Sequence, residues 1–147
     1  MATASRFPLL SGLAAEHVSK LKECACVQEF RKGDLIFKQG DQANRLYLIL
    51  CGAVFLSHAG LKRNVLIQTL SAGEVLGWSW LFPPHAWHFN ARASEPTRML
   101  VFNGERLRDL CKDQPVFGYE LMKRVAEVVI QRLQTTRRKL LKLSGDS

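Results

Sequence analysis

Two short pairs of side chains in this 147-residue chain have the chemistry of metal ligands. They are Cys24-x-Cys26 and His85-x-x-His88. A structural zinc site takes four such ligands at narrow spacings. No second cysteine pair follows Cys24 and Cys26 at the spacing of a zinc finger, and no cysteine or carboxylate lies within a few residues of the two histidines in the sequence. We therefore predict no metal site, and we interpret His85 and His88 as histidines that line a pocket or the surface.

The four cysteines do not form the pattern of a disulfide framework. Cys24 and Cys26 fall where a helical pattern gives way to a strand, Cys51 falls in an apolar strand and Cys111 in a helix. The chain is longer than most disulfide-stabilised domains, and its first residues lack the pattern of a secretory leader. We expect reduced, mostly buried thiols in a cytoplasmic protein.

Catalytic motifs are missing from the sequence. It contains no nucleophile elbow, no glycine-rich phosphate loop followed by lysine, and no paired histidine–carboxylate motif. Metal chemistry of the cupin type, which also uses a β-roll, needs a His-x-His strand and a later histidine. His58, His85 and His88 do not supply that spacing. We predict that the chain is not an enzyme.

The elements that position these residues follow from the hydrophobic periodicity. From residue 27 to residue 102, short strands with a period of two are separated by turns that contain glycine. This pattern predicts a mainly β fold with flanking helices, built on an antiparallel, jelly-roll-like β-roll. Residues 1–147 would form a single domain. The expected elements are an N-terminal helix (7–24), strands at 27–30, 35–38, 45–51, 53–57, 64–70, 74–76, 90–94 and 97–102, and C-terminal helices (103–113 and 115–143).

The last helix carries a hydrophobic seam. Its seam residues are spaced alternately by four and three positions, which is the period of a coiled coil. A helix of this length cannot bury one whole face against a small roll, so we predict a homodimer in which a symmetric partner helix covers the seam. The alternative is a helix that folds back onto its own roll. The predicted seam is Met122, Ala126, Val129, Leu133, Thr136, Leu140 and Leu143.

Much of the net charge of +8 gathers on the same helix, where seven basic side chains stand against two acidic ones between residues 120 and 143. Nucleic-acid contact is one interpretation. The other is a solvated face beside the seam, with cations favoured near a helix C-terminus. We favour the second, because no aromatic residues are interleaved with the basic ones. No apolar run is long enough to span a membrane.

Residues 30–54 contain a longer motif of glycine and apolar residues that resembles a known family. It reads Phe30-x-x-Gly33-x-x-Ile36-Phe-x-x-Gly40-Asp-x-Ala43-x-x-Leu46-Tyr-x-Ile49-x-x-Gly52-x-Val54. With the order helix, roll and two helices, it resembles the cyclic-nucleotide-binding domain of the catabolite-activator and protein-kinase-A regulatory type. The resemblance extends from about Phe7 to Leu143, and it implies a regulatory β-roll.

Ligand chemistry in that family belongs to one segment, which normally reads Gly-Glu-Leu, a short helix and Arg-Ser/Thr-Ala. Backbone N–H groups and the arginine bind the cyclic phosphate, and the glutamate accepts from the ribose hydroxyl. Here residues 77–91 read GWSWLFPPHAWHFNA. Gly77 matches, Trp78 stands where the glutamate is expected, and the arginine position falls on Trp87 or His88.

The aromatic residues of this segment permit two interpretations. They could line an altered, more apolar pocket for a different ligand, or they could fill the former pocket as core. The resemblance implies that any ligand would touch Gly77, Trp78, Ser79, Trp87, His88 and Asn90.

We predict a dimeric regulatory module in which binding of a cyclic nucleotide (cAMP or cGMP) is impaired or altered, and which acts through a protein partner. The alternative is a true sensor that binds a cyclic nucleotide or another small molecule at residues 77–91. A transcription factor of the family continues into a helix-turn-helix. This sequence ends shortly after Leu143, so contact with DNA would require a separate partner.

Overall fold

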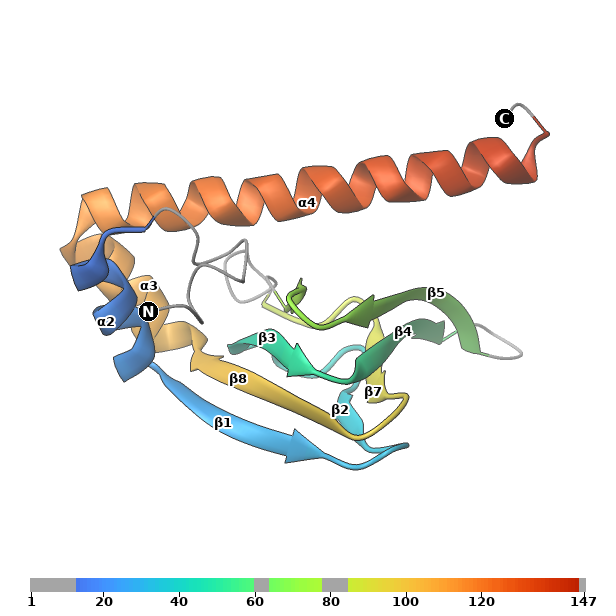
Figure 1. Cartoon of the computed structure of the whole chain (residues 1–147), viewed down its shortest axis with the longest axis horizontal. Helices are drawn as coiled ribbons and strands as arrows, with labels where there is room; N and C mark the ends of the chain where they lie inside the picture. Colours follow the sequence, from blue (N-terminus) through green and yellow to red (C-terminus); the bar gives the residue numbers. More distant parts are fainter. Residues whose placement is uncertain (1–12, 60–63, 78–84, 146–147) are drawn as a thin grey trace.

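The computed structural model describes residues 13–59, 64–77 and 85–145. These residues form eight strands in two four-stranded antiparallel sheets, with strand orders β1-β8-β3-β6 and β2-β7-β4-β5 (Figure 1). The predicted β-roll with flanking helices is confirmed. The strands are β1 (Ala25–Phe30), β2 (Leu35–Phe37), β3 (Arg45–Cys51), β4 (Ala53–Ala59), β5 (Asn64–Ser71), β6 (Val75–Leu76), β7 (Asn90–Ala93) and β8 (Thr97–Asn103). The helices are α2 (Ala15–Glu23), α3 (Gly104–Asp113) and α4 (Pro115–Leu143).

Strand β3 separates two hydrophobic cores. Four consecutive side chains of this strand, residues 46–49, are buried, which matches its continuous apolar sequence. Tyr47 and Ile49 face the interior of the roll, while Leu46 and Leu48 face the helices. The core on the helix side of β3 is completed by Leu21, Phe102, Leu107, Phe117 and Leu121. The helices therefore pack on the outer surface of one sheet.

Local sequence signals explain where the C-terminal helices begin. The Asn103 side chain accepts a hydrogen bond from the backbone N–H of Arg106 at 3.1 Å, so it caps α3. Pro115 occupies the first turn of α4, where a missing N–H has little cost. The two helices approach closely at Gly118, since a Cβ there would lie 3.0 Å from the carbonyl oxygen of Cys111.

Helix α4 packs on the rest of the molecule mainly through its first third. Its buried residues are Phe117, Gly118, Leu121 and Val125. Figure 1 shows the helix continuing along one side of the roll towards the C-terminus. None of the helices among the described residues is long and apolar enough to cross a membrane.

Two sequence expectations need correction. The described N-terminal helix begins at Ala15, with Ala14 in an extended conformation before it, and not at residue 7. Residues 7–12 of the predicted helix lie outside the described residues. The cysteines are free, but only Cys24 is buried and Cys111 half-buried. Cys26 and Cys51 are exposed, because β1 is an edge strand and Cys51 ends β3 beside a turn.

Candidate functional site

The segment expected to hold a ligand starts at Gly77, directly after β6. Gly77 is buried and has φ +90°, a conformation that only glycine adopts without strain. A Cβ at this position would lie 2.8 Å from Cη2 of Trp87 and 2.9 Å from the carbonyl oxygen of Arg45. Glycine is therefore required here both by the backbone angle and by the indole ring packed against it.

Trp87 lies inside the roll. Its side chain is 4% exposed and stacks on the ring of Phe37, with centroids 3.8 Å apart and planes 10° from parallel. The Tyr47 ring lies 6.2 Å away in a tilted arrangement. The Trp87 backbone is also fixed, because its N–H donates to the carbonyl of Asp41 at 3.0 Å and its carbonyl accepts from Gly40 at 2.9 Å. Trp87 is thus an integral part of the roll's core.

This interior disfavours charge. Burial raises the pKa of the Tyr47 phenol, and the nearby Arg45 acts in the opposite direction with a smaller effect. The same desolvation would act on a cyclic phosphate placed beside Trp87, unless a cation came with it. Arg92 is the first arginine after Trp87 in the sequence. It is exposed and donates through Nη1 to the carbonyl of Gly33 at 2.6 Å, in the turn that precedes β2.

The other described residues predicted to bind a ligand, His88 and Asn90, are not buried in the core with Gly77 and Trp87. His88 is exposed. Asn90 is half-buried at the start of β7, and its Oδ1 accepts from the backbone N–H of Gln39 at 2.7 Å. Asn90 therefore has a structural bond of its own. Trp78 and Ser79 lie outside the described residues.

The predicted seam of α4 is open to solvent over most of its length. Met122 is half-buried and packs against the helical core, whereas the other six seam residues are exposed. Leu133, Leu140 and Leu143 have 67%, 62% and 85% of their surface accessible. The helix thus follows its own roll and still presents an apolar stripe that the roll does not cover.

The basic side chains of α4 have different surroundings. Arg124 lies 3.8 Å from the carboxylate of Glu120, one turn earlier, and the ammonium group of Lys123 lies 5.4 Å from the ring centroid of Tyr119. Arg132 faces a cleft against β5 and β6 that the sequence did not predict. Within the part of the chain that the structure describes, no three histidine, cysteine or acidic residues are grouped so as to hold a metal ion.

Comparison with known proteins agrees with this geometry. The family model of the cyclic nucleotide-binding domain matches residues 27–114. The cyclic AMP receptor protein of Thermus thermophilus is 31% identical over 116 residues, which are 78% of this chain and 53% of that protein. A structure from Geobacter metallireducens assigned to the cyclic nucleotide-binding proteins superimposes with a TM-score of 0.80 at 29% identity, covering 90% of this chain and 99% of the other.

A third similarity is to an enzyme but covers little of it. Glutaminase 1 of Bradyrhizobium diazoefficiens is 34% identical over 70 residues, which are 48% of this chain and 11% of that protein. The chain therefore spans between about a tenth and about half of the length of these two curated relatives.

Proposed function

Because the chain belongs to the cyclic nucleotide-binding domain family, a family of regulatory domains, we propose that it is a dimeric, non-catalytic regulatory module whose nucleotide-binding segment has lost most of its affinity for cyclic nucleotides. The observation that carries this proposal is the position of Trp87. At one of the two positions that align with the phosphate-binding arginine, the chain has an indole packed on Phe37 beneath Gly77.

The expected loss of affinity is large. A hydrogen bond to a charged group contributes roughly 1.5–3 kcal/mol. Losing the arginine alone would therefore weaken binding by about ten- to a hundredfold or more. Replacement of the ribose-binding glutamate by Trp78 adds to this loss. A micromolar site would move towards the millimolar range.

Exposed apolar surface on α4 supports the dimer. A partner helix would cover the stripe formed by Val129, Leu133, Leu140 and Leu143, which water surrounds in the single chain. Arg124 pairs with Glu120 and Lys123 lies over the ring of Tyr119 on the same helix. These contacts favour a solvated basic face over a nucleic-acid interface. The module would then transmit its signal through a protein partner.

Thermal unfolding in the presence of nucleotide tests the proposed loss of affinity. A ligand at a thousand times its Kd stabilises the folded state by about 4.1 kcal/mol. Each kcal/mol shifts the Tm of a domain of this size by about 2–4 °C. A micromolar site would thus raise the Tm by about 8–16 °C at 1 mM ligand. We expect a rise of at most about 2 °C with either cAMP or cGMP.

Adenosine 5′-monophosphate at the same concentration serves as the control, because it has the same base and ribose without the cyclic phosphate. A large rise with a cyclic nucleotide but not with the control would overturn the proposal. The second candidate function, a sensor for a different small molecule, is favoured by the cleft beneath α4, which lies apart from Trp87.

A further inference from the structure

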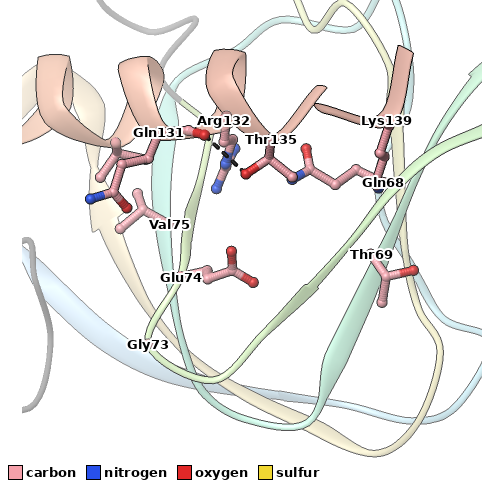
Figure 2. A pocket seen from close by; sticks show the side chains of 10 residues that line it. Gln68, Thr69, Gly73, Glu74, Val75, Gln131, Arg132, Thr135 and Lys139 are labelled. Atoms are coloured by element: carbon pink, nitrogen blue, oxygen red, sulfur yellow. Dashed lines mark hydrogen bonds between the residues drawn. The ribbon is translucent and has the colours of Figure 1, made fainter. Parts of the chain in front are cut away.

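Helix α4 and the strands β5 and β6 enclose a cleft with a volume of about 240 Å³ (Figure 2). On the helix side it is lined by Val128, Gln131, Arg132, Thr135 and Lys139, which share one face of α4 because they are spaced by three or four residues. Gln68, Thr69, Glu74 and Val75 line it from the roll. Among the described residues of the segment discussed above, Gly77, Trp87, His88 and Asn90 do not line this cleft.

The charges of the cleft come from both sides. Figure 2 shows Arg132 extending from α4 into the cleft and Glu74 below it on the turn between β5 and β6. Glu74 is held in place, because its Oε2 accepts from the backbone N–H of Ser71 at 2.7 Å. Burial lowers the pKa of Arg132 to about 10, with Glu74 acting in the opposite direction, so the guanidinium stays protonated at neutral pH.

Apart from Lys139, the other polar groups of the cleft are uncharged. Thr135 donates from its hydroxyl to the carbonyl of Gln131 at 3.0 Å, so its oxygen remains an acceptor towards the cleft. The side-chain amides of Gln68 and Gln131 can both donate and accept. Lys139 stands two helical turns beyond Arg132 and adds a second cation, so the lining has two positive charges and one negative charge.

We infer that this cleft is a binding site for a small hydroxylated molecule that carries one oxyanion group. Arg132 and Lys139 supply the charge-assisted hydrogen bonds that recognise a phosphate or carboxylate group. Glu74 and the Thr135 oxygen accept hydrogen bonds from hydroxyl groups of the ligand. The volume equals that of roughly eight water molecules, which suits a small metabolite better than a nucleotide.

Calorimetric titration of the full chain tests this inference, with glycerol 3-phosphate and glycerate as probes. The two probes distinguish a phosphate ester from a carboxylate as the source of the oxyanion, and binding of either supports the site. Glycerol has the hydroxyl groups without the charge and should not bind. The inference concerns residues of one chain, so it requires neither a dimer nor binding of a cyclic nucleotide.

Charge-removing variants locate the site. We expect Arg132→Gln and Lys139→Gln each to weaken binding of the bound probe by about ten- to a hundredfold, since each removes one charged hydrogen-bond donor. Arg138→Gln is the matched control, because it removes an equal charge from an exposed position of α4 outside the cleft. Circular dichroism would establish that the Arg132 variant is folded, and the Lys139 variant tests the site from its other end.

The inference is overturned if neither probe binds the wild-type chain saturably up to tens of millimolar. It is also overturned if Arg138→Gln weakens binding as much as Lys139→Gln, since the interaction would then follow only the overall charge of the helix. Saturable binding that the two cleft variants lose and the control retains supports it.

Discussion

The indole ring of Trp87 stacks on the ring of Phe37, with 3.8 Å between their centroids, and its edge lies 2.8 Å from where a Cβ of Gly77 would be. This contact joins the glycine that begins the family's ligand segment to an aromatic residue near the segment's end. Trp87, one of the residues expected to contact a ligand, is therefore part of a hydrophobic core in this chain.

Removing the indole should destabilise the fold strongly. Trp87→Ala leaves a cavity in the roll and is expected to lower the free energy of unfolding by about 3–5 kcal/mol. His88→Ala is the control, because His88 is exposed and such a substitution typically changes stability by no more than about 0.5 kcal/mol. Urea denaturation of both variants measures the difference. Equal stabilities would mean that Trp87 does not belong to the core.

Substitution of Gly77 tests the contact from the other side. Gly77→Ala combines a left-handed backbone with an overlap against Trp87 and the Arg45 carbonyl. Gly40→Ala is a matched control, because Gly40 has nearly the same φ but open space around its Cα. The control should cost about 1–2 kcal/mol of stability, and Gly77→Ala about 1–3 kcal/mol more. The overlap is absent if the two variants unfold at the same denaturant concentration.

Much of the fold could be predicted from sequence, because its signals are local. The strands follow period-two patterns, or a continuous apolar run in β3, between glycine turns, and Asn103 and Pro115 mark the starts of α3 and α4. The exposure of Cys26 and Cys51 was not predictable in this way. For Cys26 it depends on the edge position of β1, and strand order is a non-local property.

The site was less predictable than the fold, because it depends on contacts between residues far apart in the sequence. The resemblance placed the expected arginine position at Trp87 or His88, but did not say which of the two side chains points inward. Pairing of the Trp87 backbone with Gly40 and Asp41, nearly fifty residues away, decides it. The α4 cleft was missed because Arg132 and Glu74 meet only through the path of the long helix over the roll.

The seam of α4 predicts a definite effect on assembly. Leu133→Lys places a charge in the middle of the exposed apolar stripe and should convert a dimer into a monomer in sedimentation experiments at tens of micromolar protein. Gln134→Lys adds the same charge one position away from the seam and should leave the dimer intact. A wild-type chain that sediments as a monomer, or a dimer that survives Leu133→Lys, would refute the seam.

Alkaline pH should destabilise the protein through its packed thiols. Burial raises the pKa of the thiols of both Cys24 and Cys111. The unfolded chain therefore releases these protons first. The contribution of the neutral thiols to stability is complete below their unfolded pKa and is lost as the pH rises through the folded value. The free energy of unfolding should fall above about pH 8.5.

Cysteine variants check the origin of this pH dependence. Cys111→Ala should reduce the fall in stability between neutral and alkaline pH. Cys26→Ala is the control, because Cys26 is exposed in the folded chain. Denaturant titrations at two pH values provide the measurement, and an unchanged slope in the Cys111 variant would assign the effect to other groups.

The affinity of the chain for cyclic AMP and cyclic GMP, measured by isothermal titration calorimetry, tests most directly whether Trp87 has replaced a nucleotide site. With the indole in the core and no arginine at its position, the titration should give no saturable binding below the millimolar range. A saturable heat with a Kd in the micromolar range would contradict the account and show that the segment still binds the family's ligand.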